Sequence, residues 1–309
     1  MKDKTLYILA PMYEVTDTVF RSIIAELSPP DIFYTEFVNV DGLQSKGREA
    51  ILPRLKYSKK EKPLIAQIWG SKPENFTATA KELVKMGFDG IDINMGCPDR
   101  NVTRAGLCSA LINNRELAKE IIDATKAGAG KLPVSVKTRL GYNSIDYSWH
   151  EFLLNQSIDS LIIHARTKKQ MSKVPADYEA LKEIVKLRDK ISPKTKIIGN
   201  GDIFSRKHGD DIAKKYKLDG VMIGRGVFRD PYVFSKNSPW EKLSKDERID
   251  IFKKHAKLWK KTYGDNKPVY ILNKFCKIYI NNFDGAKELR DDLMQSQNID
   301  ELIDKLNKL

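Results

Sequence analysis

The chain has 309 residues, a formal net charge of +13 and 41% hydrophobic residues. This length suits one large barrel domain plus a small appendage, so we expect two units. The positive charge indicates a polyanionic partner, such as a nucleic acid or an anionic membrane surface. The cysteines, Cys97, Cys108 and Cys276, are too scattered for a disulfide framework or a CxxC metal site, so we expect no metal and a reducing cytoplasmic location.

The N-terminal residues MKDKTLYILAPM contain no apolar stretch of the kind found in secretory signals. No apolar run elsewhere approaches the length of a membrane span. We therefore expect a protein with no targeting segment and no membrane partner, and we take a monomer as the working assumption.

Short β-rich runs alternate with helical segments through most of the chain. The eight runs are Leu6–Met12, Ile32–Val38, Leu64–Trp69, Gly90–Met95, Val134–Leu140, Ser160–Thr167, Lys196–Ile203 and Gly220–Gly224. The intervening helical segments include Pro73–Met86, Arg115–Lys126, Tyr178–Lys190 and Ser205–Lys217. This alternation predicts parallel strands joined by crossover helices, and the strand count predicts an α/β fold of the (β/α)8 TIM-barrel type. A doubly wound sheet is disfavoured because no GxGxxG follows the first run.

Polar residues gather at the carboxyl ends of the predicted strands. Buried parallel strands are normally rich in Val, Ile and Leu, so this pattern is not what core packing alone produces. In TIM barrels the chemistry takes place at that end of the barrel. The collected candidates are Pro11, Met12, Glu36, Asn39, Gln67, Asn94, Cys97, Lys137, Arg139, His164, Arg166, Asn200, Gly201, Asp202, Gly224, Arg225 and Gly226.

Two of these strand ends predict specific chemistry. The strand beginning at Ile91 stops at Gly96-Cys97-Pro98, which presents the amide of Asn94 and the thiol of Cys97 on a rigid element. A lone cysteine here would be read as a core residue, but the other strand ends favour a functional one. The glycine-containing runs 198–202 and 223–226 follow strands seven and eight, where barrels often bind phosphate, and Arg225 adds a fork of donors.

After Pro231 the pattern changes to helices only, and we place a boundary at Pro239-Trp240. This divides the chain into a barrel domain, 1–238, and a helical domain, 239–309. In the first helix Ile249, Phe252, Ala256, Trp259 and Tyr263 form one apolar stripe, so Trp259 is interpreted as core rather than as a platform for bases. Further helices are predicted over Val269–Asn281, Ala286–Met294 and Asp300–Lys308, and a small bundle is the simplest assembly.

The helical domain carries a concentrated positive charge. Lysines occupy positions 253, 254, 257, 260, 261, 267, 274 and 277, and Asp265 is the one acid in that stretch, giving +7 of the total +13. A solvated helix face normally mixes charges of both signs. The stretch therefore predicts a contact surface for a phosphate backbone.

Taken in chain order, motifs between residues 7 and 235 resemble those of the tRNA-dihydrouridine synthase family. They are Ala10-Pro11-Met12 with Val15-Thr16-Asp17 and Phe20-Arg21, Gln67 with Gly70, Asn94-Met95-Gly96-Cys97-Pro98, Val134-Ser135-Val136-Lys137-Thr138-Arg139-Leu140-Gly141, His164-Ala165-Arg166-Thr167, Pro175-Ala176-Asp177, Asn200-Gly201-Asp202 and Met222-Ile223-Gly224-Arg225-Gly226. The combination is specific, although no single motif is.

The resemblance implies an FMN-containing barrel followed by a helical tRNA-binding domain, and an enzyme that reduces a D-loop uridine of tRNA with NADPH or NADH. The positions that match the family's FMN contacts are Pro11, Met12, Gln67, Lys137, His164, Asn200, Gly201, Asp202, Gly224 and Arg225. Cys97 matches its proton donor, Asn94 the residue that holds the uracil, and Arg139 and Arg166 polar groups at the pocket mouth. We add Glu36, Lys274 and Lys277 as candidate substrate contacts.

The chemistry fits these assignments. Reducing the 5,6 double bond of uracil needs a hydride at C6 and a proton at C5, so an acid must lie opposite the reduced flavin. A thiol with an ordinary pKa of about 8.5 is mostly protonated at neutral pH and can serve, while nearby Lys137 and Arg139 can lower that pKa. Lys137 also suits the flavin edge on which negative charge grows.

The chain departs from the family pattern between Asp99 and Ser109. Asp99-Arg100 stands where a lysine is usual, and Cys108 where a glycine is usual before Ser-Ala-Leu. We interpret Cys97, not Cys108, as the acid, because Cys108 lies past the strand end. The departures leave the reaction class unchanged and bear on loop conformation and on the uridine that is chosen.

Two other functions remain open on the sequence. One is a flavin barrel that acts on a free pyrimidine, as dihydroorotate dehydrogenases do, which would not explain the lysines between 253 and 277. The other is a non-catalytic RNA-binding barrel without cofactor. Flavin absorbance of the purified protein distinguishes the RNA-binding barrel, which has no cofactor, from the flavin enzymes.

Overall fold

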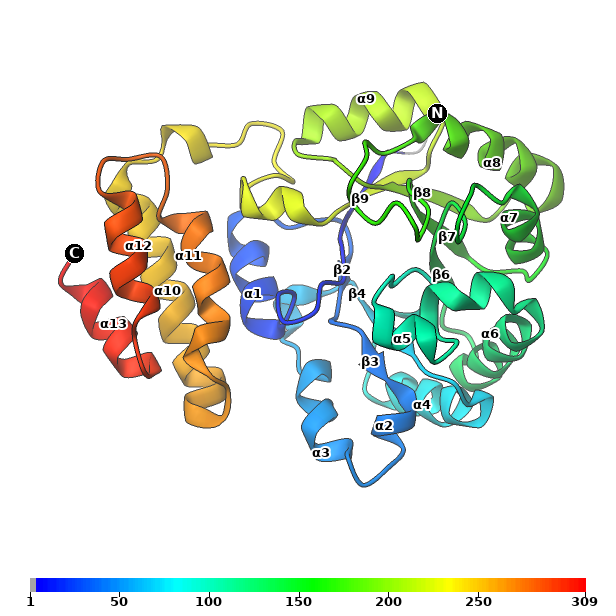
Figure 1. The fold of residues 1–309 in the computed structure, drawn as a ribbon, viewed down its shortest axis with the longest axis horizontal. Helices are drawn as coiled ribbons and strands as arrows, with labels where there is room; N and C mark the ends of the chain where they lie inside the picture. Colours follow the sequence, from blue (N-terminus) through cyan, green and yellow to red (C-terminus); the bar gives the residue numbers. More distant parts are fainter. Residues whose placement is uncertain (1–3) are drawn as a thin grey trace.

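The computed structural model describes residues 4–309, and its strands form a parallel barrel (Figure 1). The strands are β1 (Leu6–Leu9), β2 (Phe33–Tyr34), β3 (Val38–Asn39), β4 (Leu64–Trp69), β5 (Gly90–Asn94), β6 (Val134–Arg139), β7 (Ser160–His164), β8 (Lys196–Asn200) and β9 (Gly220–Ile223). They are ordered β1-β9-β8-β7-β6-β5-β4-β2, and a bridge between Ile8 and Ile32 joins the two ends. The predicted TIM barrel is confirmed.

The second predicted strand, Ile32–Val38, is two short strands, β2 and β3, and both pair with β4. The interruption follows from a side-chain hydrogen bond between neighbouring strands. The hydroxyl of Thr35 accepts a hydrogen bond from the backbone N–H of Gln67 at 3.1 Å, in place of a backbone carbonyl. It also donates to the carbonyl of Glu36 at 2.6 Å, so the ladder breaks at Thr35 and resumes at Val38.

The barrel has two apolar layers, as alternation along its strands requires. A small cluster comprises Ile8, Ala10, Tyr34, Ile162, Ile198 and Met222. A larger cluster includes the strand residues of the opposite register, such as Tyr7, Leu9, Leu161 and Ile163, together with apolar residues of the helices. Each fully buried aliphatic or aromatic side chain stabilises the fold by about 1.5–3 kcal/mol, so these layers fix the strand ends in space.

Helices connect the strands and surround the barrel in Figure 1. They are α1 (Thr18–Leu27), α2 (Val40–Leu43), α3 (Arg48–Ile51), α4 (Pro73–Lys85), α5 (Arg100–Arg104), α6 (Arg115–Ala129), α7 (Tyr147–Leu154), α8 (Tyr178–Ile191) and α9 (Arg206–Tyr216). Side-chain caps fix several of their starts, as where Asp17 accepts from the N–H of Phe20 and Asp177 from that of Ala180. The four helices predicted between strands are all present.

The C-terminal part is entirely helical and lies beside α1 (Figure 1). Its helices are α10 (Lys245–Tyr263), α11 (Asn273–Tyr279), α12 (Ala286–Met294) and α13 (Ile299–Asn307). The predicted stripe of α10 is buried throughout, which confirms Trp259 as a core residue. The helix predicted over Val269–Asn281 is instead a 3-10 turn, Val269–Leu272, followed by the shorter α11.

The C-terminal helices rest on α1 through aromatic and charged contacts. The ring centroid of Phe20 lies 5.0 Å from that of Phe275, and Phe228 lies 6.2 Å from the same ring. The ammonium of Lys267 forms an ion pair of 2.6 Å with Asp17, whose side chain is 3% exposed. One continuous apolar cluster therefore spans the barrel and the helices. Within residues 4–309 no helix has the length and hydropathy to cross a membrane.

Candidate active site

A cavity of about 220 Å³ lies at the carboxyl ends of the strands, around the place where β1 pairs with β9. Nine of the ten predicted FMN contacts line it, namely Pro11, Met12, Lys137, His164, Asn200, Gly201, Asp202, Gly224 and Arg225. They come from five different strand ends, which is how a TIM barrel assembles a site. The tenth, Gln67, belongs to a neighbouring buried cluster.

Two glycines line this cavity. Gly201 has a backbone conformation that favours glycine, and at Gly224 the absence of a side chain leaves room. Gly201 has a φ of +124°, and a Cβ there would lie 3.1 Å from the ring of His164. A Cβ on Gly224 would come within 3.7 Å of the sulfur of Met12. Backbone is thus open to the cavity beside both loops, as close approach of a phosphate requires.

Several cations surround the cavity. The ammonium of Lys137 donates to Asn200 at 3.2 Å, and burial, followed by the charge of Arg139, lowers its pKa to about 8. Burial, together with the charges of Arg139, Lys137, Arg166 and Arg225, holds the pKa of His164 far below its ordinary value, so its imidazole is neutral. Such a positive field favours an anionic ligand.

Asp202 is the carboxylate that organises the arginines. It accepts hydrogen bonds from Arg166 and from the N–H of Ala176 at 3.1 Å. Its other oxygen accepts from Arg225 at 3.1 Å, and the side chain of Arg225 remains 56% exposed. Asp202 therefore fixes the position of Arg225, which keeps free donors at the cavity rim.

Cys97 follows β5, and Asn94 holds its backbone in place. The side-chain oxygen of Asn94 accepts from the N–H groups of Gly96 at 3.0 Å and Cys97 at 2.9 Å. Its amide nitrogen donates to Gln67 at 3.0 Å. Asn94, predicted to hold the substrate, thus uses its oxygen to shape the loop and keeps one amide hydrogen for another partner.

Sequence reasoning missed a buried carboxylate beneath this network. Asp92 accepts from Gln67 at 2.7 Å and from Ser135 at 2.5 Å. Its side chain is fully buried, and burial raises its pKa to about 6, although both hydrogen bonds act in the opposite direction. The signal was present, because an acid interrupts the apolar run Ile91–Ile93. Asp92 orients Gln67, which in turn orients Asn94.

Arg139 and Arg166, predicted to line the pocket mouth, are both buried. Arg139 donates to the carbonyls of Gly96 at 2.7 Å and of Thr167 at 3.1 Å, which ties the Cys97 loop to the loop after β7. Arg166 donates to the carbonyl of Val174 at 2.5 Å and contacts His164 at 3.1 Å. Both guanidinium groups hold loops in place.

The pKa of the Cys97 thiol is raised, contrary to the direction expected from its cationic neighbours. Burial is the largest cause, and the charge of Asp99 adds to it. Arg139 and Lys137 do lower the pKa, but the loss of solvent outweighs them. The half-buried Cys97 is therefore a thiol rather than a thiolate at neutral pH.

The loop from Asp99 to Ser109 contains the residues that depart from the family pattern. Asp99 caps α5, since its carboxylate accepts from the N–H groups of Asn101 at 2.9 Å and Val102 at 3.2 Å. Cys108 has a φ of +51°, a conformation that favours glycine, and its side chain is 1% exposed. The N–H of Ser109 donates to the carbonyl of Cys97 at 3.3 Å, so this loop supports the thiol.

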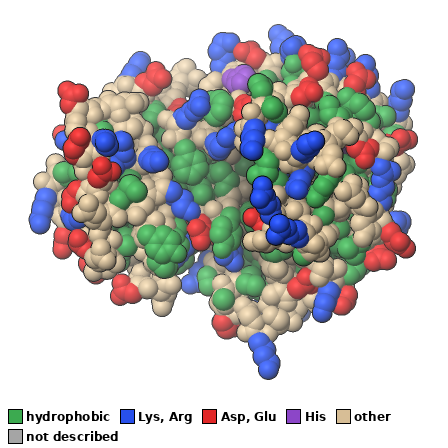
Figure 2. Space-filling view, in the orientation of Figure 1, with side chains coloured by type: hydrophobic (Ala, Val, Ile, Leu, Met, Phe, Trp, Pro, Cys, Tyr) green, Lys and Arg blue, Asp and Glu red, His purple; other side chains and the backbone are tan. Residues whose placement is uncertain are grey.

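The lysine stretch of the C-terminal helices is not uniformly free. Lys254 and Lys260 pair with Glu26 and Asp300, and Lys253 lies 3.5 Å from Asp250. Lys267 pairs with Asp17, and the predicted substrate contact Lys274 lies 3.3 Å from Glu14. Among residues 4–309, Lys257, Lys261 and the predicted contact Lys277 have no ion-pair partner. The predicted +7 surface is thus reduced to fewer free cations. On the face shown in Figure 2, Lys and Arg side chains also gather near the middle, over the barrel.

Glu36, another predicted substrate contact, does not line the first cavity. Its side chain is 3% exposed and lines a separate cavity between the barrel and the helices. Among the described residues, 4–309, no group of three or more His, Cys, Asp and Glu side chains is arranged to hold a metal ion.

A parallel barrel with a cation-rich cavity and a protonated thiol at its strand ends has the arrangement of a barrel oxidoreductase. The sequence matches the dihydrouridine synthase family over residues 8–309, and the chain belongs to that family. The protein is an oxidoreductase enzyme.

Similar proteins agree with this assignment. A probable tRNA-dihydrouridine synthase of Staphylococcus aureus (strain COL) is 48% identical over 302 residues, covering 96% of this chain and 91% of the relative. Probable tRNA-dihydrouridine synthase 2 of Bacillus subtilis (strain 168) is 44% identical, covering 97% and 92%. The structure of a 2-naphthoyl-CoA reductase complex has a TM-score of 0.58 at 12% identity and covers 78% of this chain and 50% of that one. The old yellow enzyme homologue from Zymomonas mobilis has a TM-score of 0.51 at 13% identity, with 74% and 87% covered. At such identities the structural similarity concerns the fold alone.

Proposed function

We propose that this protein is an FMN-dependent tRNA-dihydrouridine synthase that takes electrons from NADPH or NADH and reduces a D-loop uridine. The observation that carries the proposal is the placement of a protonated Cys97 thiol by Asn94, at the same barrel end as a cation-rich cavity. Membership of the family and the names of the relatives support it. A tRNA substrate implies a cytoplasmic location.

FMN suits the donors of the first cavity. The open backbone beside Gly201 and Gly224 and the free donors of Arg225 fit its phosphate, and Lys137 fits the flavin edge that becomes negative on reduction. His164 is neutral and can accept as well as donate a hydrogen bond. When bound, FMN supplies the hydride for C6 of the uracil, having been reduced by the nicotinamide nucleotide.

The residues of the chain supply the proton and the geometry. Cys97 holds a proton on its sulfur and delivers it to C5, because burial keeps its pKa above neutral pH. Asn94 fixes the Cys97 backbone and has one amide hydrogen left for a uracil carbonyl. Arg139 ties the Cys97 loop down, which limits movement of the thiol during proton transfer.

The helical part, residues 239–309, is proposed to bind tRNA. Its unpaired Lys257, Lys261 and Lys277 suit phosphate contacts, whereas paired lysines such as Lys254 stabilise the junction with the barrel. Reversing the charge of Lys277 should weaken tRNA binding more than reversing that of Lys308, an exposed lysine near the C-terminus.

The direct test compares wild type with Cys97→Ala on an unmodified tRNA transcript. Wild type should form dihydrouridine, mapped by reverse transcription stops after alkaline treatment, and Cys97→Ala should lose nearly all of this activity while keeping the flavin absorbance. Full activity of Cys97→Ala would remove the proton-donor role. A protein that reduces free uridine or orotate but not tRNA would be the free-pyrimidine enzyme instead.

A further inference from the structure

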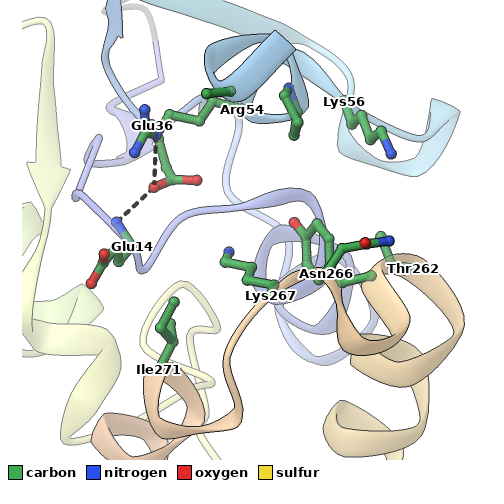
Figure 3. A pocket seen from close by; sticks show the side chains of 11 residues that line it. Glu14, Glu36, Arg54, Lys56, Thr262, Asn266, Lys267 and Ile271 are labelled. Atoms are coloured by element: carbon green, nitrogen blue, oxygen red, sulfur yellow. Dashed lines mark hydrogen bonds and ion pairs between the residues drawn. The ribbon is translucent and has the colours of Figure 1, made fainter.

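A second cavity, of about 400 Å³, lies between the barrel and the C-terminal helices and is unused by the proposed proton and hydride chemistry (Figure 3). Its barrel side includes Glu36, Arg54 and Lys56, and its helical side includes Asn266 and Lys267. Figure 3 shows these side chains reaching toward a common space from the two parts of the molecule. The cavity combines cations with a buried carboxylate, so it is not an apolar packing defect.

A rigid turn separates this cavity from the first one. Met12 lines the first cavity and Glu14 the second. The turn is closed by hydrogen bonds between Met12 and Thr16, at 2.9 Å and 3.1 Å. Glu14 has a φ of +53°, which directs its N–H to Glu36 at 2.6 Å and its carboxylate to Lys274 at 3.3 Å. The two cavities are therefore neighbours with a fixed wall between them.

An exposed tyrosine in the same turn is held in one orientation. The ring of Tyr13 is 49% exposed, and its centroid lies 5.8 Å from that of Phe37. The guanidinium of Arg54 lies 4.9 Å from the Tyr13 centroid and donates to its hydroxyl at 3.0 Å. Tyr270, 64% exposed, precedes Ile271, which lines the cavity from the helical side. A half-exposed aromatic ring beside a cation is a usual platform for an unstacked base. Tyr13 does not itself line the cavity but adjoins Glu14, which does.

Glu36 provides a second, independent feature. Its side chain is 3% exposed and lines the cavity. One oxygen accepts from Glu14 and lies 3.9 Å from Arg54, while the other has no hydrogen-bond partner within residues 4–309. A carboxylate oxygen that lines a cavity without a partner can accept from N–H donors, such as the amino group of a nucleobase.

We propose that this cavity binds one further nucleotide of the RNA, adjacent in the strand to the uridine that is reduced. Its base stacks on Tyr13, its amino group donates to Glu36, and its phosphate lies near Lys56. The proposal rests on the proposed function and extends it, because two neighbouring nucleotides must then leave the RNA stack together. The contacts at the second one select the sequence context of the target.

The test is a double-mutant cycle on binding, performed with the full holoenzyme and end-labelled tRNA transcripts. Each nucleotide of the D loop is replaced in turn by an abasic residue, and the Kd is measured by fluorescence anisotropy. Tyr13→Ala should weaken binding by about tenfold, in the range of base–aromatic stacking, and Tyr13→Phe should stay close to wild type. One abasic position next to the reduced uridine should weaken wild type similarly and leave Tyr13→Ala unaffected.

Two results would overturn the proposal. One is a wild-type Kd for Tyr13→Ala. The other is that, at every abasic position, the loss of binding free energy from Tyr13→Ala and the loss from the abasic residue add when the two changes are combined. Lys56→Ala should weaken binding more than Lys85→Ala, which removes an exposed lysine from α4. Retained flavin absorbance shows that each variant is folded. If no transcript yields dihydrouridine, the proposed function fails, whereas the binding cycle still decides the fate of this cavity.

Discussion

The side-chain oxygen of Asn94 lies 2.9 Å from the backbone nitrogen of Cys97 and accepts its hydrogen bond. The same oxygen accepts from Gly96, and Asn94 is in turn oriented by Gln67 and the fully buried Asp92. The position of the proposed acid thus depends on a chain of buried polar groups that begins inside the barrel. Such networks hold a single geometry only while every member is paired.

Replacing Asn94 by alanine should reduce kcat by about tenfold or more, because the Cys97 loop loses its acceptor and the thiol its fixed position. Leaving buried N–H groups unpaired should also reduce stability by about 1–3 kcal/mol each. Asn94→Ser should recover part of kcat, since a hydroxyl can accept from the same N–H groups. Steady-state kinetics and thermal unfolding of both variants check this, and an unchanged kcat in Asn94→Ala would contradict it.

The raised pKa of Cys97 predicts the direction of the pH profile. The proton is present below the thiol pKa and is lost as the pH rises through it, so kcat should be constant near neutral pH and fall on the alkaline side. Because burial raises the pKa of the Cys97 thiol, the midpoint should lie above the pKa of an exposed cysteine, about 8.5. Single-turnover rates across the alkaline range measure it. Cys97→Ser should lack this alkaline limb, and a wild-type midpoint at or below that of an exposed cysteine would argue against a buried thiol.

Lys137 should make FMN affinity dependent on pH. Its pKa is lowered to about 8, so the ammonium charge is complete at lower pH and is lost as the pH rises through that value. FMN should therefore dissociate more readily at alkaline pH, and binding of the anionic ligand should itself move the midpoint upward. Lys137→Met should weaken FMN by about tenfold or more and show a flatter profile. Flavin fluorescence titrations measure both, with Lys131→Met, at an exposed position, as control.

Cys108 offers a matched pair of variants. Its φ of +51° disfavours a side chain by about 1 kcal/mol, while its buried thiol contributes packing. Cys108→Ala loses the packing and keeps the strain, whereas Cys108→Gly loses both. Urea unfolding should therefore find Cys108→Gly more stable than Cys108→Ala by about 1 kcal/mol. Equal stabilities would mean that the backbone strain is absorbed by the loop.

The sequence was sufficient for the barrel and for most of its first cavity, because strand period and strand-end polarity are local signals. The split of the second strand was not predictable, since it depends on the hydroxyl of Thr35 meeting Gln67 across the sheet. Local patterns also overstated the basic surface: Lys267 finds Asp17, 250 residues away in the chain, and only the fold brings the two together.

In the candidate site, too, some features follow from the local sequence and others depend on the fold. The structure places the Cys97 thiol at the β5 end, where the sequence predicted it, but the pKa of that thiol moves upward because burial, which no local pattern reports, outweighs its cationic neighbours. The resemblance to the family placed Arg139 and Arg166 at the pocket mouth, and in the structure both side chains are buried under the loops that they hold. The order of residues along a strand predicts which groups meet at its end, but it does not predict how deeply each side chain is buried.

The aromatic contact between Phe20 and Phe275 has a consequence for how specificity can change. Because a single hydrophobic core runs through this seam, the helices cannot swing freely about the barrel as on a hinge. A tRNA bound across both parts, as proposed, would therefore meet one preformed surface. A relative that selects another nucleotide must therefore either alter the side chains on that surface or repack the seam, and small shifts in the Phe20–Phe275 packing would tilt the whole RNA relative to Cys97.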